Sequence, residues 1–537
     1  MKQTASIIFL SFLIHAIVQI VFDSTVAAGT GRHMVIYGGL TAVDLVPVAN
    51  NADILIVENA RLDYLEYMKQ INPELKIFKY YHALGVYKIY EEWDRVNQKE
   101  EWFVHDIATG QRLKANRYGW YLMNNASEAW QKFLIRKVSE QTEDIFDGVF
   151  MDVFWNRFVN KFVAEGTDLP GWPPEYIINF WTANMIRLLK QIRTSYPKRI
   201  FINGAHNEFI PYVDGCMEEA FAHTNWQSDL YFPNHAEYMR SILKIQRLNK
   251  LGKTILVQSG SKGDYPSAIE KVFKFSSASY FLVKNNITSF GFHPLHTYYF
   301  KGIPHYENYS LNLGQPKGNY HVFQERKPEP NLVSNPNFNA GLNQWSILSG
   351  KPAVYSDTPK NGNSMLFMGS IDRTDKIQSE FIPVKGDTGY TISADCKSDM
   401  NRALSASYKK LGLQGRFYNK SKKKLPGAFG LKFDAGAYDW LPFERTFTSP
   451  TGAAFFRIRL GFIGNGRGKG WVDNIYFGLA SRHAKILKRD FSHGTVLVNF
   501  GKKAASLDLT NLQSDYGVKY LYMRAYEGII LPTKETE

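Results

Sequence analysis

The stretch Asp147-Gly148-Val149-Phe150-Met151-Asp152 opens with an Asp-Gly turn, continues as an apolar run and ends on a carboxylate. A second stretch, Asp214-Gly215-Cys216-Met217-Glu218-Glu219, has the same order of residue types. Continuous apolar runs of this length are typical of strands that are buried on both faces, as in a parallel sheet covered by helices. Each stretch therefore predicts a buried strand whose C-terminal end carries an acid.

Similar apolar runs recur through the first 300 residues and alternate with stretches of helical periodicity. The runs are Met34–Tyr37, Ile54–Val57, Lys76–Tyr81, Gly148–Val153, Arg199–Asn203, Gly215–Glu219, Thr254–Gln258 and Ile287–Phe292. The helical stretches include Arg61–Gln70, Ser127–Thr142, Pro174–Ser195 and His235–Leu251. Eight such units predict a (β/α)8 barrel, the TIM-barrel fold, over residues 33–304. An open doubly wound sheet is the alternative, but no Gly-x-Gly-x-x-Gly follows the first run.

The pattern changes after the charged, Pro-rich stretch at residues 325–330, which reads as a linker. Residues 331–478 contain short alternating runs broken by Gly, Asn and Asp, the pattern of an all-β sandwich. The last segment, 481–534, is strand-rich but too short to bury a good core alone. We expect it to pair with residues 305–325 in a small β-domain, with the sandwich as an insertion.

Composition excludes several classes of protein. With 44% hydrophobic residues in 537, the chain is not disordered. Only two cysteines, Cys216 and Cys396, are present, which excludes a disulfide framework and a cysteine zinc site. The net charge of +14 is scattered except at Lys420-Ser421-Lys422-Lys423-Lys424. That run fits a solvated loop or contact with an anionic partner such as an acidic glycan, and we expect no nucleic-acid partner.

The N-terminus has the pattern of a secretory signal peptide. Lys2 precedes an apolar run from Ile7 to Val21, and small residues lead to Ala28, so we expect residues 1–28 to be removed. The alternative, an uncleaved anchor, is disfavoured because His15 and Gln19 interrupt the run. We therefore expect a secreted protein, extracellular or periplasmic, without stable membrane insertion.

Asp152 and Glu219 are the candidate catalytic residues. Reacting groups of such barrels lie where strands end, and two carboxyls facing one cavity suit glycoside hydrolysis. The alternative is that Asp152 caps a helix and Glu219 pairs with an arginine such as Arg157. Since successive strand residues point to opposite faces, the shared offset favours Glu219 over Glu218.

Other polar and aromatic residues near strand ends are candidates for binding a sugar. They are Tyr81, His82, Trp155, Asn203, Trp226 and Gln258. Each could instead be structural.

The barrel region resembles a known family. The motifs that carry the likeness are Gly148-Val-Phe-Met-Asp152-Val-Phe-Trp155, Ile202-Asn203-Gly204 and Asp214-Gly215-x-x-x-Glu219-x-Phe221. The likeness resumes near the C-terminus, at Arg489–Asn499. Together they resemble the hypothetical glycosyl hydrolase-like family 15, a barrel family distantly similar to the family 114 endo-α-1,4-polygalactosaminidases. The resemblance implies hydrolysis of O-glycosidic bonds, with Asp152 and Glu219 as the acidic pair.

Residues 331–478 resemble a cenC-type family 4/9 carbohydrate-binding module, a jelly roll. The likeness rests on Asn331-Leu-Val-Ser-Asn335-Pro-Asn-Phe338-Asn339, on Trp345 and on Trp471-Val-Asp473-Asn-Ile475. Such modules usually carry Glu where this chain has Asn339. A structural calcium that used this position would keep Asp473 as its main acidic ligand, so the substitution argues against the metal.

The sequence as a whole predicts a secreted glycoside hydrolase that needs no cofactor for catalysis and is held on a polysaccharide or oligosaccharide substrate by its module. The main alternative is a non-catalytic, secreted glycan-binding protein. A metal-dependent deacetylase would need a His/Asp cluster that the sequence does not show. The oligomeric state cannot be predicted from these patterns.

Overall fold

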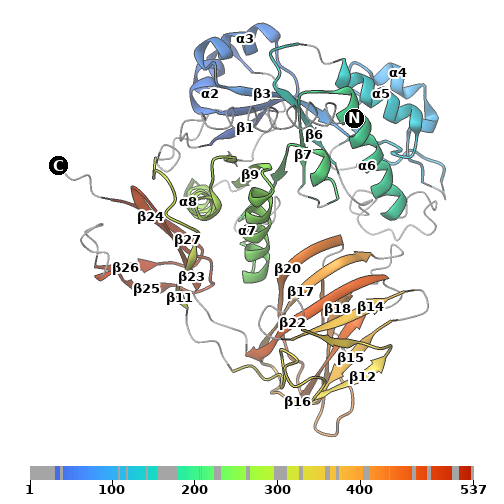
Figure 1. Ribbon diagram of the computed structural model, residues 1–537, viewed down its shortest axis with the longest axis vertical. Coiled ribbons are helices and arrows are strands. Elements are labelled where there is room, and N and C mark those ends of the chain that lie inside the picture. The colour runs from blue at the N-terminus through green and yellow to red at the C-terminus, as the bar shows by residue number, and fades with distance from the viewer. Residues whose placement is uncertain are drawn as a thin grey trace, which may run out of the picture.

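The computed structural model describes most of the chain in three connected parts (Figure 1). The described residues are 31–36, 40–106, 109–115, 119–140, 143–154, 178–204, 206, 208–222, 232–261, 266–294, 311–325, 330–356, 363–370, 374–402, 411–427, 429–433, 436–462, 467–479, 485–510 and 519–533. The predicted signal peptide and two predicted sugar-binding residues, Trp155 and Trp226, lie outside them.

The first part is a barrel of eight parallel strands. In order around the barrel they are β1 (His33–Ile36), β2 (Ile54–Val57), β3 (Lys76–His82), β6 (Gly148–Asp152), β7 (Arg199–Asn203), β8 (Gly215–Glu218), β9 (Thr254–Ser261) and β10 (Thr288–Pro294). A parallel bridge between Arg32 and Phe290 joins the last strand to the first. The Phe290 amide also donates to the Gly31 carbonyl oxygen at 2.6 Å, so the sheet closes on itself.

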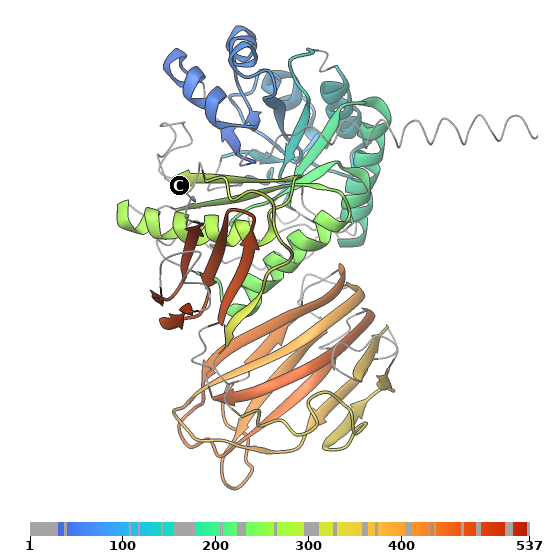
Figure 2. The same ribbon diagram turned by 60° about the vertical axis from the view of Figure 1, so that its left-hand side comes forward.

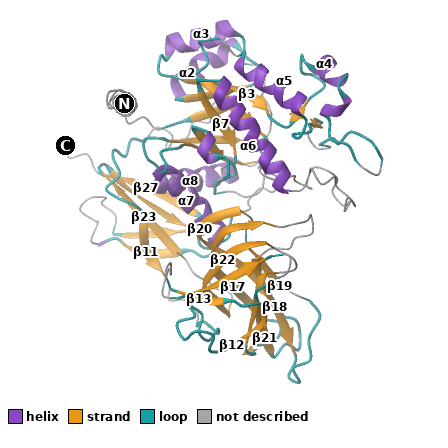
Figure 3. Cartoon of the chain, turned by 45° about the vertical axis from the view of Figure 1, so that its right-hand side comes forward, coloured by secondary structure: helices purple, strands orange, loops and turns teal. Residues whose placement is uncertain are grey.

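Helices surround this barrel (Figures 1 and 3). They are α2 (Leu45–Asn51), α3 (Leu62–Ile71), α5 (Glu128–Ser139), α6 (Ile178–Ser195), α7 (His235–Lys250) and α8 (Pro266–Val283), with the short α4 (Trp93–Asn97) among the βα loops. The N-termini of α5 and α7 are capped by Ser127 and Asn234, and Glu237 completes a capping box with Asn234. Between β7 and β8 the described chain has only the 3-10 turn Ile210–Tyr212.

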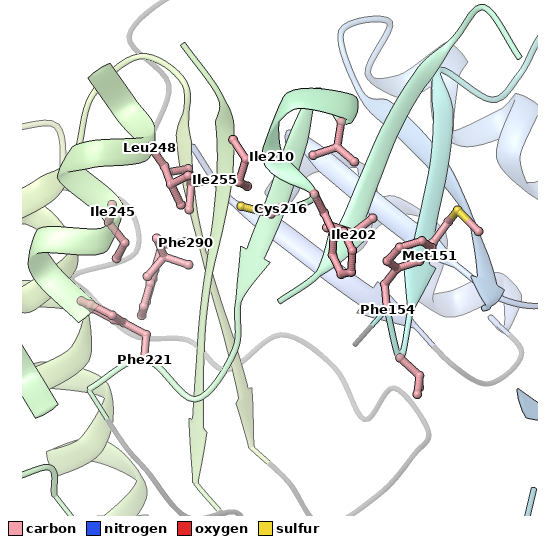
Figure 4. Close-up of a cluster of buried hydrophobic side chains, with 14 of the residues drawn as sticks. Met151, Phe154, Ile202, Ile210, Cys216, Phe221, Ile245, Leu248, Ile255 and Phe290 are labelled. Atoms are coloured by element: carbon pink, nitrogen blue, oxygen red, sulfur yellow. The ribbon is translucent and has the colours of Figure 1, made fainter. Parts of the chain in front are cut away.

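Strand residues alternate between the barrel interior and the helical layer. The interior is filled by Val35, Ile56, Phe78, Tyr80, Phe150, Phe201, Met217 and Leu256. The residues between them face outward, and Figure 4 shows Ile255 beside Ile245 and Leu248 of α7. Burial on both faces explains why these strands read as continuous apolar runs.

The Asp-Gly pairs that open two strands have a structural role at the N-terminal end of the barrel. Asp147 accepts a hydrogen bond from the Ile77 amide at 2.9 Å, and Asp214 accepts one from the Ile200 amide at 2.8 Å, so each ties its strand to the preceding one. A Cβ atom at Gly148 would lie 2.3 Å from the Arg199 carbonyl oxygen. Only glycine fits there.

The C-terminal residues form a small sheet against α8 (Figure 2). Its strands are β11 (His321–Glu325), β23 (Lys485–Phe491), β24 (Gly494–Asn499) and β27 (Glu527–Pro532), flanked by the hairpin β25 (Ala505–Asp508) and β26 (Tyr520–Met523). Leu487 and Phe491 of β23 and Val496 and Val498 of β24 belong to the same core as buried residues of the barrel. The segment before the linker therefore pairs with the end of the chain, as β11 with β23.

The chain between β11 and β23 forms a sandwich of two antiparallel sheets with a core of its own. One sheet contains β12 (Trp345–Ser349), β15 (Lys376–Ser379), β16 (Ile382–Pro383), β18 (Leu411–Tyr418), β19 (Phe429–Lys432) and β21 (Phe455–Phe462). The other contains β13 (Ala353–Tyr355), β14 (Ser364–Gly369), β17 (Gly389–Arg402), β20 (Gly436–Thr448) and β22 (Arg467–Leu479). The sandwich meets the barrel where β20 packs on α7, and Arg240 donates to the Pro442 carbonyl oxygen at 2.8 Å.

The predicted fold class, a TIM barrel with a small β-domain and an inserted β-sandwich, is confirmed. None of the helices in the described part of the chain has both the length and the apolar character needed to cross a bilayer.

Arg489 connects the C-terminal sheet to the barrel. Its guanidinium donates to the carbonyl oxygens of Phe281 and Lys284 at 2.9 Å each, and to that of Gly318 at 2.9 Å. Because Arg489→Met leaves these acceptors without a charged donor, we expect it to lower the free energy of unfolding by about 2–4 kcal/mol. Urea denaturation measures this. The exposed Lys502→Met is the control and should change it by less than about 0.5 kcal/mol; equal effects would contradict the assigned role.

Candidate active site

Polar side chains form a ring at the C-terminal end of the barrel. On several strands, the inward position that follows the last apolar interior residue is polar. These positions are Glu58 after Ile56, Asp152 after Phe150, Asn203 after Phe201, Glu219 after Met217 and Gln258 after Leu256. Five strands, β2 and β6 to β9, thus bring polar groups to one end of the barrel, where TIM barrels carry their active sites.

Asn203 joins the two predicted catalytic acids. Its Nδ2 donates to Asp152 Oδ1 at 2.8 Å and to Glu219 Oε2 at 2.9 Å. Because one nitrogen contacts both, the two oxygens lie within about 6 Å of each other. This upper limit on the distance is near the roughly 5–5.5 Å that separates the two carboxyls of retaining glycosidases. It is below the roughly 6.5–9.5 Å separation in inverting ones.

Asp152 is surrounded by donors. Besides Asn203, the Tyr80 hydroxyl donates to Oδ2 at 2.6 Å, and the amide of Val153 donates to Oδ1 at 2.6 Å. A carboxylate accepts all three bonds without itself supplying a proton. These contacts fix the orientation of the side chain and suit its ionised form.

Glu219 differs from Asp152 in its electrostatics. Its side chain reaches solvent, yet protein atoms surround it closely enough that loss of hydration raises its pKa to about 7. The negative charge of Asp152 adds to this rise, and the hydrogen bond from Asn203 opposes it. Near neutral pH, a substantial fraction of Glu219 therefore holds a proton that it can donate.

Glu218 points the opposite way from Glu219. Its carboxylate lies 2.8 Å from Lys244 Nζ and also accepts from Ser241, both on α7. Alternation along the strand thus directs Glu218 toward α7 and Glu219 toward Asn203, as the sequence pattern predicted. Among the described residues, no arginine or lysine forms an ion pair with Glu219; Arg157 lies outside them.

The backbone turns sharply after each acid. Val153 has φ 55° and Ala220 has φ 58°, both in the left-handed region that non-glycine residues rarely adopt. For the β-branched Val153 this conformation is an outlier, and such strain is typically held in place by surrounding contacts at functional sites. The amide of Ala83 donates to the Asp152 carbonyl oxygen at 3.0 Å, which helps to hold the first turn.

Two residues of the site were not predicted, Tyr80 and Glu58. Glu58 Oε1 accepts a hydrogen bond from Tyr90 at 2.5 Å. Burial raises the pKa of Glu58, and the charge of Asp152 contributes to the rise. The signal was present in the sequence, because Ile54–Val57 is an apolar run that ends directly before a carboxylate, as in the two motifs that open the analysis.

Tyr81 and His82 are neighbours in β3, but their side chains point in opposite directions. Tyr81 faces outward, is buried, and donates its hydroxyl to the Lys137 carbonyl oxygen at 3.2 Å. This placement corrects the expectation that it binds sugar. His82 faces the site beside Asp152, packed against Trp120, and burial lowers its pKa to about 4, so its ring is neutral at physiological pH.

Gln258 and His82 carry buried polar atoms without a described partner. Gln258 Oε1 and His82 Nδ1 have no hydrogen-bond partner among the described residues. Buried polar atoms usually have partners, so these two are exceptions among the described residues.

The predicted metal residue Asp473 lies in the sandwich, far along the chain from this site. It is buried, and its Oδ1 accepts from the Asn474 amide at 2.6 Å. It faces Asp395 across β17 and β22, and Asp395 accepts from Asn474 Nδ2 at 2.7 Å. The part of the chain that the structure describes contains no group of three or more His, Cys, Asp or Glu residues able to hold a metal ion.

A TIM barrel whose strand ends carry two carboxyls, one of them with a raised pKa, has the groups that glycoside hydrolysis requires. Residues 69–332 match the family model "Hypothetical glycosyl hydrolase family 15", which agrees with the resemblance seen in the sequence. The match supports a glycoside hydrolase.

Comparison with solved structures returns distant neighbours. The enzymatically active domain of bacteriophage CBA120 tailspike protein 4 is 14% identical over 28% of this chain and 21% of its own, with a TM-score of 0.24. The glycoside hydrolase domain of PelA from Pseudomonas aeruginosa is 12% identical over 51% and 97%, with a TM-score of 0.37. A family 16 carbohydrate-binding module is 17% identical over 28% and 99%, with a TM-score of 0.21. No curated protein matches the sequence.

The raised pKa of Glu219 predicts a pH-dependent effect of Glu219→Gln on stability. Between the ordinary pKa of 4.5 and the folded value of about 7, the folded state binds more protons than the unfolded state, so the parent protein loses stability as pH rises through this window. The Gln variant lacks this term. Its melting temperature relative to the parent should therefore rise from pH 4.5 to pH 7.

Glu218→Gln is the matched control for this measurement. It removes the carboxylate that is paired with Lys244, so it should lower the melting temperature at pH 7. A difference between Glu219→Gln and the parent that stays constant from pH 4.5 to pH 7 would contradict the raised pKa.

Proposed function

We propose that the barrel hydrolyses O-glycosidic bonds of a polysaccharide or oligosaccharide, with Asp152 as the nucleophile and Glu219 as the general acid. The single observation that carries this proposal is that Asn203 donates to both acids. It holds the carboxylate of Asp152 and the carboxyl of Glu219, whose pKa is raised, side by side. Two carboxyl groups in such different environments are the arrangement that glycosidases use to assign acid and nucleophile roles.

The first step forms a glycosyl ester. A carboxylate oxygen of Asp152 attacks the anomeric carbon, the bond from that carbon to the leaving oxygen breaks, and the Glu219 proton passes to the leaving oxygen. In the second step, the ionised Glu219 takes a proton from water, and the water oxygen displaces Asp152. Glu219 is protonated again at the end, so one water molecule is consumed for each bond that is cut.

The neighbouring residues support these roles. Tyr80 and Asn203 donate hydrogen bonds that orient Asp152 and stabilise its negative charge before the ester forms and after it breaks. Neutral His82 and Gln258 offer polar atoms to sugar hydroxyls. Because the two carboxyls supply both the electron pair and the proton, we propose hydrolysis without a metal or organic cofactor.

In this proposal, the N-terminal segment and the sandwich bring the barrel to its substrate. The N-terminal segment directs export, and the sandwich binds glycan and keeps the barrel near its substrate, which raises the local substrate concentration. The N-terminal residue of the protein recovered from culture medium tests the export step, and cleavage after Ala28 is the expected result.

Substitutions of the two acids test the catalytic proposal. After a panel of neutral, amino and acidic glycans has identified a substrate by release of reducing ends, Glu219→Gln should lower kcat by roughly 10²–10⁴-fold, because it cannot donate a proton. Asp152→Asn should stop turnover while glycan binding persists. The activity of the parent should fall as pH rises above about 7, where Glu219 loses its proton.

The control for these substitutions is Glu218→Gln, which removes a neighbouring carboxyl that faces α7 and should keep most of the activity at a temperature where the variant is folded. Addition of a chelator should leave the rate unchanged. A parent protein that binds glycans but releases no reducing ends from any of them would support the non-catalytic alternative.

The short distance between the two carboxyls predicts retention at the anomeric carbon. Proton NMR of the first product formed from the identified substrate should show the same anomer as the bond that was cut, before mutarotation equilibrates it. Initial formation of the opposite anomer would rule out Asp152 as the nucleophile and would assign it the role of a base acting on water.

A further inference from the structure

The outer face of one sandwich sheet gathers arginines and aromatic rings. On β18 and β21, Phe417, Phe456, Ile458 and Leu460 point into the sandwich core. The alternate residues therefore point outward. We call these outward residues, together with the adjacent Phe381 and Lys422, the arginine face: Arg416, Tyr418, Phe455, Arg457, Arg459, Phe381 and Lys422.

The positive charges of this face lie close together. Arg416 and Arg457 are directly opposite each other in the antiparallel ladder, and Arg459 lies two positions along β21 on the same side. Like charges in opposite positions destabilise a sheet unless opposite charge lies nearby. In the described part of the chain, none of these three arginines forms an ion pair with a carboxylate, and Arg416 Nε is buried without a hydrogen-bond partner.

The aromatic rings of the face are already in contact with one another and with cations. Phe381 packs edge-on against Tyr418, with 5.0 Å between ring centroids. The Arg457 guanidinium lies 4.7 Å from the centroid of the Phe381 ring, and Lys422 Nζ lies 5.1 Å from it. The Phe381 ring is thus covered by cations, which disfavours stacking of nucleic-acid bases and holds the cations in place.

The arginine face is not the surface that meets the barrel. The sandwich contacts α7 through β20, which belongs to the other sheet. In Figure 3, β18 and β21 lie on the part of the sandwich away from the barrel helices. Next to this face, the turn that follows β18 carries Lys420–Lys424, the lysine run noted in the sequence.

We propose that the arginine face binds a polyanionic polysaccharide, one that carries carboxylate or sulfate groups along its chain. Guanidinium groups bind such groups in a bidentate manner, and a row of them along a sheet suits a repeated charge along a polymer. The inference rests on the proposed role of the sandwich as a glycan-binding module, and it specifies the class of glycan.

Binding is measured with the full-length chain carrying Asp152→Asn, so that the ligand stays intact. The probes are heparin for sulfate, polygalacturonate for carboxylate, dextran as the neutral polymer and a single-stranded thymidine oligonucleotide as the nucleic acid. We expect binding to heparin, polygalacturonate or both, with dissociation constants that rise with salt. Arg416→Gln/Arg457→Gln/Arg459→Gln should weaken this binding by at least roughly tenfold and reduce its salt dependence.

The control variant is Lys132→Gln/Lys190→Gln/Lys250→Gln, which removes the same number of exposed charges from the barrel helices and should bind like the parent. If the triple arginine variant does not fold, Arg459→Gln alone serves, because Arg459 is exposed and has no hydrogen-bond partner among the described residues. It should weaken binding several-fold.

Four results would overturn the proposal. They are equal binding by the arginine variant and the parent, equal loss in the lysine control, tighter binding of the oligonucleotide than of either acidic polysaccharide, and binding of dextran alone. Hydrolysis is measured separately, so polyanion binding through these arginines by an inactive barrel would count only against the proposed catalysis.

Discussion

One amide group holds the candidate site together. The Nδ2 of Asn203 donates to both Asp152 and Glu219, from a strand that lies between those of the two acids. Without this donor, no described hydrogen bond would link the two carboxyls, whose negative charges disfavour such a close approach. The parallel order of β6, β7 and β8 makes the arrangement possible, because it brings inward side chains from three successive strands to the C-terminal end of the barrel.

The same strands show how the barrel separates structure from chemistry. At their N-terminal ends, Asp147 and Asp214 accept backbone hydrogen bonds and join neighbouring strands. At their C-terminal ends, the acids accept side-chain hydrogen bonds and face solvent or polar groups. The two ends therefore use acidic residues for different purposes, stability at one end and, in the proposed function, catalysis at the other.

Much of the fold could be predicted from the sequence, because strands buried on both faces leave a strong apolar signal. Ile54–Val57 and Arg199–Asn203 were predicted to the residue, and the other barrel strands to within a few positions. The site was predicted in part, since alternation along a strand distinguishes Glu219 from Glu218. Tyr81 was misplaced because a run such as Lys76–Tyr81 does not reveal which of two adjacent aromatic residues, Tyr80 or Tyr81, faces inward. Hydrogen bonds between strands, such as that from Tyr80 to Asp152, depend on register and cannot be read from the sequence at all.

The position of the sandwich has a consequence for the order in which the protein is made. β11 is synthesised before the sandwich, but its partner β23 follows more than 150 residues later. Until the ribosome has delivered β23, β24 and β27, the face of α8 that contacts these strands has no cover and β11 has no partner. The nascent barrel must therefore wait in an incomplete state while a self-contained sandwich folds beside it, and that interval is when a chaperone would be most useful to this chain.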